Sequence, residues 1–174
     1  MRTKLLFLGS ILPIVLVSDV VSKRWAMVAL EGSPQELFGG LVPLTLAFNR
    51  GAAFGVSIGN DPRWFFIPVT VLALILLGFL LARADAWDRF RIFALSLVLS
   101  GALGNLIDRV RWNQGVVDFI GPIDLGFMDW PIFNVADMAI SCGAVALAIS
   151  FWSEERSPRG GAEPVPAEGS QTTV

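Results

Sequence analysis

The sequence predicts an all-α integral membrane protein with four transmembrane helices. Hydrophobic residues make up 54% of the 174 residues and charged residues only 16%, which is low for a soluble domain. Several apolar runs approach the roughly 20 residues that a helix needs to cross the hydrocarbon core. The six tryptophans fall at or near the ends of these runs, which is typical of an interfacial aromatic belt.

The composition also restricts the possible chemistry. A net charge of -2 provides no basic patch, so no nucleic-acid partner is expected. Cys142 is the one cysteine, which rules out a disulfide within the chain. The absence of histidine removes Ser-His and Cys-His nucleophile systems and the usual zinc sites. Chemistry must therefore come from Asp, Glu, Lys, Ser or backbone groups.

The first span is predicted over about residues 5–30. An apolar run follows Arg2 and Lys4, as it would in a signal peptide. Apolar character resumes after residue 24 and no small-x-small cleavage site is evident, so a retained spanning helix is favoured. Asp19 and Lys23 lie four residues apart on one helical face and can pair within the membrane. We interpret the pair as structural, with a direct catalytic role as the alternative.

The connection 31–63 is long, and long connections are usually functional or disordered. Residues 44–48 alternate between apolar and small or polar residues as a short strand does. The following segment, Asn49 to Gly55, includes Gly51 and other small residues that let the backbone approach a ligand closely. The spacing differs from a phosphate-binding loop, and a plain glycine turn remains the alternative.

The second and third spans are predicted at about 64–82 and 92–109, joined by the charged turn 83–91. The third span contains small residues that suit close helix packing, namely Ser96, Ser100, Gly101 and Gly104. At its end, Asn105, Asp108 and Arg109 present an amide, a carboxylate and a guanidinium together. Alternatively, Arg109 simply interacts with the dipole at the end of a helix.

The last part of the chain carries two acids of interest. Residues 115–120 are predicted as a strand with Asp118 in its middle, where an ordinary loop acid is the alternative. The fourth span is predicted at about 135–152, with Asp137 just inside its start. A carboxylate inside a spanning segment usually marks a site, although Asn134 and Asp137 also fit a helix capping box. Residues 1–152 would form the membrane domain and 153–174 a disordered cytoplasmic tail.

Four spans place both termini on one side and the connections 31–63 and 110–134 together on the other. The distribution of arginine and lysine favours cytoplasmic termini. The polar residues near the outer ends of the spans can then meet at one depth. Two carboxylates in a dry site do not both ionise easily, so one of Asp118 and Asp137 can hold a proton while the other acts as a base. This is the aspartic-protease arrangement.

Five motifs of polar and small residues occur in one order along the chain. They are Asp19 with Lys23, Asn49-Arg50-Gly51-Ala52-Ala53-Phe54-Gly55, Gly104-Asn105-Leu106-Ile107-Asp108-Arg109, Val116-Val117-Asp118-Phe119 and Phe133-Asn134-Val135-Ala136-Asp137. On these motifs the chain resembles the prolipoprotein signal peptidases, the type II signal peptidases of bacteria, over roughly residues 4–152. Any one motif would be weak evidence, whereas five in the family's order are specific.

The resemblance implies an intramembrane aspartyl endopeptidase that cuts preprolipoproteins just before a diacylglyceryl-modified cysteine. It implies Asp118 and Asp137 as the catalytic dyad, and polar residues of the substrate groove at Asn49, Gly51, Asn105, Arg109 and Asn134. Asp19, Lys23 and Asp108 would be structural. The outer connections would form a small extracytoplasmic β-rich platform with a mobile lid. The resemblance implies no metal or organic cofactor, and a monomer among the lipids of the bacterial cytoplasmic (inner) membrane.

Other functions stay open from the residues alone. A carboxylate-rich site without histidine can bind Mg²⁺ for lipid phosphoryl transfer, which chelators would inhibit. A transporter can use Asp19, Lys23 and Asp137 as a proton relay and would cleave nothing. Ser22 beside Lys23 suggests a Ser-Lys hydrolase, but neighbouring residues of a helix point in different directions. Cys142 follows a segment that loosely resembles a lipidation box, yet it lies inside the fourth span.

Overall fold

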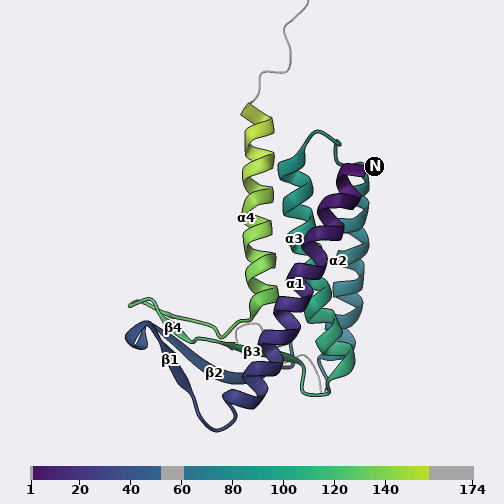
Figure 1. Ribbon diagram of the computed structural model, residues 1–174. Coiled ribbons are helices and arrows are strands. Elements are labelled where there is room, and N and C mark those ends of the chain that lie inside the picture. Colours follow the sequence, from purple (N-terminus) through teal and green to yellow (C-terminus); the bar gives the residue numbers. More distant parts are fainter. Residues whose placement is uncertain (1, 52–60, 157–174) are drawn as a thin grey trace, which may run out of the picture.

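The computed structural model describes residues 2–51 and 61–156 of the chain. In these residues four long helices form a bundle (Figure 1), namely α1 (Arg2–Ala29), α2 (Arg63–Arg83), α3 (Arg89–Arg111) and α4 (Val135–Arg156). Each helix is long and apolar enough to cross a membrane by length and composition. The prediction of four transmembrane helices is therefore confirmed.

Helix α3 packs against each of the other three helices, most extensively against α4. Small residues make the close approach possible. A Cβ atom built on Gly101 would collide with the backbone oxygen of Ala136 in α4, and one built on Gly104 would lie 2.9 Å from a carboxylate oxygen of Asp19 in α1. The hydroxyl of Ser100 donates back to the Ser96 carbonyl of its own helix, at 2.6 Å. The predicted packing role of this stripe of small residues is confirmed for its glycines.

The strands gather at the end of the bundle where α4 begins, opposite the N-terminus (Figure 1). An antiparallel sheet is formed by β1 (Gln35–Leu37), β2 (Val42–Asn49) and β3 (Val116–Ile120), in that order, with a 3-10 turn, η1 (Phe38–Gly40), between β1 and β2. A short hairpin of β4 (Ile123–Asp124) and β5 (Asp129–Trp130) follows. The strands predicted at 44–48 and 115–120 are confirmed, and together they make the small sheet that the resemblance implied.

An apolar cluster joins this sheet to the helical bundle. Ala26 and Leu30 at the end of α1 pack with Leu44 of β2 and Phe119 of β3, and all four side chains are buried. The ring of Trp25 meets the ring of Phe119 edge-on, with centroids 6.3 Å apart. Burying these apolar surfaces together fixes the sheet against the C-terminal end of α1. The strand that carries Asp118 is thereby held at a defined height on the bundle.

Backbone hydrogen bonds tie the start of α4 to β3. The carbonyl of Phe133 accepts from the N–H groups of Phe119 and Ile120 at 3.1 and 2.9 Å, and the N–H of Phe133 donates to Ile120 at 2.9 Å. Residue 134 therefore lies beside β3. At its other end, α4 continues to Arg156, so residues 153–156 of the expected tail are helical. Residues 157–174, and the part of the glycine-containing motif and lid at 52–60, lie outside the described residues.

Candidate active site

Asp118 lies in the middle of β3 and is only 3% exposed. Its carboxylate accepts a hydrogen bond of 2.6 Å from the side-chain amide of Asn134. In the register of the sheet, Asp118 stands opposite Ala47 of β2. Asp118 is therefore a buried residue of a regular strand, and the alternative of an ordinary loop acid is wrong.

Asp137 lies in the first turn of α4 and is partly buried. One carboxylate oxygen accepts from the side-chain amide of Asn105 at 2.7 Å, and the other accepts from the backbone N–H of Asn134 at 3.2 Å. In return, the side-chain oxygen of Asn134 accepts from the backbone N–H of Asp137 at 2.9 Å. This reciprocal pair is the predicted capping box. The capping interpretation of Asp137 is confirmed, and the same carboxylate also contacts the side-chain amide of Asn105.

Asn134 is the residue that connects the two acids. Asn134 is fully buried, and its amide nitrogen donates to the Asp118 carboxylate. Its amide oxygen accepts from the backbone N–H of Asp137, and its own backbone N–H donates to the Asp137 carboxylate. The side-chain amide nitrogen also lies 3.2 Å from the side-chain oxygen of Asn105. The carboxylates of Asp118, in β3, and Asp137, in α4, are thus both hydrogen-bonded to the same residue, Asn134.

The surroundings raise the pKa of Asp118 to about 6. Burial is the largest cause, because it penalises the charged carboxylate, and the negative charge of Asp137 adds to it. The side-chain amides of Asn134 and Asn49 and the positive charge of Lys23 oppose the rise. A carboxyl with a pKa near 6 can hold a proton or release it close to neutral pH. This is the property that an acid–base catalyst requires.

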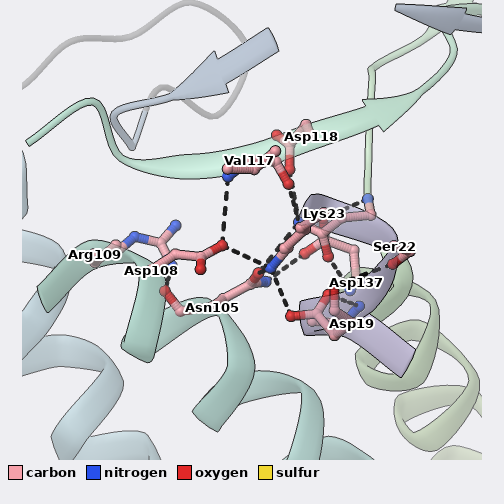
Figure 2. A network of polar contacts seen from close by, with 11 residues as sticks. Asp19, Ser22, Lys23, Asn105, Asp108, Arg109, Val117, Asp118 and Asp137 are labelled. Carbon is pink, nitrogen blue, oxygen red and sulfur yellow. Dashed lines mark hydrogen bonds and ion pairs between the residues drawn. The ribbon is translucent and has the colours of Figure 1, made fainter. Parts of the chain in front are cut away.

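Lys23 lies at the centre of a second group of charges (Figure 2). Its ammonium contacts carboxylate oxygens of Asp19 at 2.7 Å and Asp108 at 2.8 Å, and the side-chain oxygen of Asn105 at 3.1 Å. The exposed fraction of each charged residue in this group is below 10%. An ammonium has three donors, and all three are used. The predicted pairing of Asp19 with Lys23 is confirmed, and Asp108 extends it to a triad.

Asp19 also contacts the start of α4. Its second oxygen accepts from the backbone N–H of Ala136 at 3.0 Å, across 117 positions of sequence. The hydroxyl of Ser22 donates to the Asp19 carbonyl at 3.1 Å rather than to Lys23. Because the ammonium of Lys23 is already shared among three acceptors, the geometry offers no support for a Ser-Lys nucleophile.

Arg109 lies in the last turn of α3, and its guanidinium covers the ring of Phe66 at 5.6 Å. The negative charges of Asp137, Asp118 and Asp108 also act on this guanidinium. Its Nε atom is buried and has no hydrogen-bond partner among the residues that the structure describes. Sequence reasoning did not single out Phe66, because a phenylalanine near the start of an apolar span carries no distinguishing pattern.

Asn49 and Gly51 lie at the end of β2. Asn49 stands opposite Val116 in the sheet, two positions from the pair of Ala47 with Asp118, so its side chain lies on the same face as Asp118. The amide oxygen of Asn49 accepts from the N–H of Gly51 at 2.8 Å. Gly51 has a φ of +116°, and a Cβ atom there would collide with the Phe66 ring. Only glycine fits this turn beside the site.

An apolar hollow of about 400 Å³ opens at this end of the bundle, and neither Asp118 nor Asp137 is among its lining residues. It lies between α1, the sheet and the start of α4, and three of its lining residues adjoin the acids or Asn134 in sequence, namely Phe119, Phe133 and Met138. By contrast, the described ranges 2–51 and 61–156 contain no group of three or more acidic, histidine or cysteine side chains arranged to hold a metal ion. The Mg²⁺ alternative finds no ligand cluster in this part of the chain.

Comparison with known families decides the class of protein. The sequence matches the family model described as Signal peptidase (SPase) II over residues 11–153. The chain belongs to the signal peptidase II family. The lipoprotein signal peptidase of Maridesulfovibrio salexigens is 41% identical over 156 residues, which cover 86% of this chain and 97% of that protein. The lipoprotein signal peptidase of Streptococcus pyogenes serotype M2 is 40% identical, with 89% and 97% covered.

Two solved structures described as bacterial membrane enzymes share the fold of this signal peptidase II family member. One, at 2.3 Å resolution, superposes with a TM-score of 0.78 at 29% identity and covers 94% of this chain and 95% of its own. The other, at 1.9 Å, gives 0.71 at 32% identity, with 87% and 93% covered. The chain is therefore a protease and a multi-pass bacterial membrane protein, as the resemblance of its motifs implied.

Proposed function

We propose that this protein removes the signal peptide from preprolipoproteins by cutting immediately before the diacylglyceryl-modified cysteine, with Asp118 and Asp137 as its catalytic dyad. The observation that carries the proposal is the connection of both acids through Asn134, with bonds of 2.6 Å to Asp118 and 2.9 Å from the N–H of Asp137. The membership in the signal peptidase II family supports the substrate class.

In the proposed reaction the dyad carries one proton. The ionised acid removes a proton from water, and the resulting hydroxide attacks the scissile carbonyl carbon while the protonated acid donates to the carbonyl oxygen. When the tetrahedral intermediate collapses, a proton passes to the leaving amine, the peptide C–N bond breaks and the dyad is left with one proton again. The raised pKa of Asp118 suits the proton-holding role.

The groups around the dyad are proposed to hold the substrate. The buried Nε of Arg109 can donate to a peptide carbonyl. The side chains of Asn49 and Asn105 and the backbone turn at Gly51 are proposed to border the extended substrate chain. The apolar hollow beside Phe119 can take a hydrophobic group of the substrate. A monomer working among membrane lipids is part of the same proposal.

The same proposal includes an orientation. Both termini would face the cytoplasm and the sheet with the dyad would face the opposite side, because arginine and lysine are more frequent near the ends of the bundle that hold the termini and the turn at 83–91. Accessibility tags inserted in 83–91 or after Val174 should be cytoplasmic, and tags beside Gln35 or Asn113 extracytoplasmic. Extracytoplasmic tags at 83–91 would reverse the assignment.

The reaction is tested with purified protein in detergent and a preprolipoprotein peptide carrying a diacylglyceryl cysteine. Mass spectrometry should show one cut, just before the modified cysteine, and little cutting of the same peptide without the lipid. Activity should persist with excess chelator, which a Mg²⁺-dependent transferase would not tolerate. An uncut lipidated peptide, with the fold verified, contradicts the proposed function.

A further inference from the structure

The side-chain amides of Asn105 and Asn134 are each placed in one orientation by a group that can only donate. The side-chain oxygen of Asn134 faces the backbone N–H of Asp137 at 2.9 Å. The side-chain oxygen of Asn105 faces the ammonium of Lys23 at 3.1 Å. Neither donor can accept a hydrogen bond, so the atom opposite each must be the amide oxygen. The amide nitrogens then point to the two acids.

The orientation of the Asn105 amide directly affects a member of the proposed dyad, Asp137. The amide nitrogen of Asn105 donates to Asp137 at 2.7 Å, the shortest bond that carboxylate receives from the described residues. A rotated amide would place its oxygen against the Asp137 carboxylate, where two acceptors repel, and its nitrogen against the ammonium, where two donors repel. The Asp137 carboxylate opposes that rotation by the first repulsion, and Lys23 opposes it by the second.

We propose that Lys23 is a positioning residue for the dyad: by holding the oxygen of Asn105, it turns the amide nitrogen of Asn105 onto Asp137 and keeps that carboxylate aligned. This inference rests on the proposed function of the dyad. It assigns Lys23 a role beyond the structural one that its pairing with Asp19 implies.

The triad geometry explains how the ammonium is aimed. Asp19 holds it from its own helix, one turn away, and Asp108 holds it from α3, three residues beyond Asn105. With two donors fixed by carboxylates on two helices, the direction of the third donor is determined, and it points to Asn105. Lys23 is 3% exposed, so water does not compete for this third bond.

The test compares Lys23→Met with Asp108→Asn as the matched control. Asp108→Asn removes one charge of the triad but keeps a side-chain oxygen that can accept from the Lys23 ammonium, so the donor that points to Asn105 stays in place. Lys23→Met should lower kcat by about 10²-fold with KM within a few-fold, since a small misalignment of a catalytic group costs about that much. Asp108→Asn should keep kcat within a few-fold of wild type, whatever it does to the melting temperature. A purely structural Lys23 predicts instead that kcat per folded molecule is unchanged in both.

The pH profile gives a second readout. The charged groups acting on Asp118 are Asp137 from α4, Arg109 from α3 and Lys23 from α1, and the positive charge of Lys23 lowers the pKa of Asp118. Lys23→Met should therefore move the limb governed by Asp118 to higher pH. Asp108→Asn should leave that limb where it is in wild type.

Lys23→Met leaves two buried carboxylates without their cation, so it can unfold the protein. The charge-balanced double variant Lys23→Met/Asp108→Asn removes one charge of each sign and is compared with Asp108→Asn alone. The inference expects a further loss of about 10²-fold in kcat, and little additional loss when Lys23→Met is made in an Asn105→Ala background, because the two act as one unit. A folded double variant with the kcat of Asp108→Asn would overturn the inference. A wild type that does not cut the lipidated peptide would instead overturn the proposed function.

Discussion

Asn134 and Asp137 hydrogen-bond each other in both directions, through the 2.9 Å bond from the Asp137 N–H to the Asn134 side chain and the 3.2 Å bond from the Asn134 N–H to the Asp137 carboxylate. The pair both starts α4 and orients an acid of the site. Because the capping geometry uses the amide oxygen of Asn134, the amide nitrogen is left for Asp118. One short local motif thus joins a helix start to a strand acid sixteen residues earlier.

Asp19→Ala should reduce stability and yield more than intrinsic turnover. The substitution removes one of the two carboxylates of Lys23 and the acceptor of the Ala136 N–H at the start of α4. Loss of such buried partners costs on the order of 3 kcal/mol. Thermal unfolding in detergent, together with kcat per folded molecule, checks the expectation. A variant with wild-type stability and no turnover would show that Asp19 acts in the chemistry.

The polar site could be predicted from the sequence only as far as local spacing reaches. The pair of Asp19 with Lys23 follows from the four-residue helical period, and the capping box follows from its three-residue spacing. The entry of Asp108 into the triad depends on how far α1 lies from α3. At Gly104 that distance is short because the residue has no side chain, and no spacing rule gives this effect.

The contact between Asn134 and Asp118 was likewise beyond local rules. It requires the backbone bridge between Ile120 and Phe133, which pairs a strand with a loop residue. The resemblance placed both residues in one site, but no sequence pattern predicted the direct 2.6 Å hydrogen bond from the Asn134 amide to the Asp118 carboxylate. Phe66, which packs on Arg109 and leaves room only for glycine at position 51, was missed because it looks like any membrane-facing phenylalanine.

Gly101→Ala should destabilise the bundle, and Gly78→Ala should not. The new methyl group at position 101 would collide with the Ala136 carbonyl and lie 2.8 Å from Ile140, so α3 and α4 must separate. Overpacking of this kind costs about 1–3 kcal/mol. At Gly78 of α2 nothing lies within 4 Å, and alanine favours a helix by up to about 1 kcal/mol. Melting temperatures of the two variants should therefore shift in opposite directions.

The Gly101 variant should also lose activity per folded molecule, because Ala136 adjoins Asp137 in the first turn of α4. Equal melting temperatures for the two variants would contradict the close contact of α3 with α4. A stable Gly101→Ala protein with reduced kcat would indicate a shift of α4 rather than a loss of packing.

The stability of the protein should contain a component that falls as pH rises, due to Asp118. The fold raises the pKa of this carboxyl from 3.8 to about 6, so the folded state binds its proton more tightly than the unfolded state does. The component is fully present below about pH 4 and is lost as pH rises through about 6, with a size of about 3 kcal/mol. Free energies of unfolding at pH 4 and pH 7 measure it.

Asp118→Asn serves as the reference for this measurement, because its amide does not titrate. The difference in unfolding free energy between wild type and variant should change with pH in the stated direction, which separates Asp118 from the other acids. A difference that stays constant between pH 4 and pH 7 would mean that the pKa of Asp118 is not raised in the fold.

Asp118→Asn and Asp137→Asn should each abolish cleavage of the lipidated peptide while leaving the fold nearly intact. Asparagine keeps the shape of the carboxyl group but can neither accept a proton from water nor deliver one to the leaving amine. The double variant should be no less active than either single one, because the effects of substitutions within one catalytic unit are not additive.

Cleavage by mass spectrometry, thermal unfolding and binding of the uncut peptide are measured on all three proteins. Peptide binding should persist in each, since the groups proposed to hold the substrate are unchanged. Substantial turnover by a sequence-verified single variant would remove that residue from the dyad, whereas equal loss of binding and cleavage would assign it to the substrate groove.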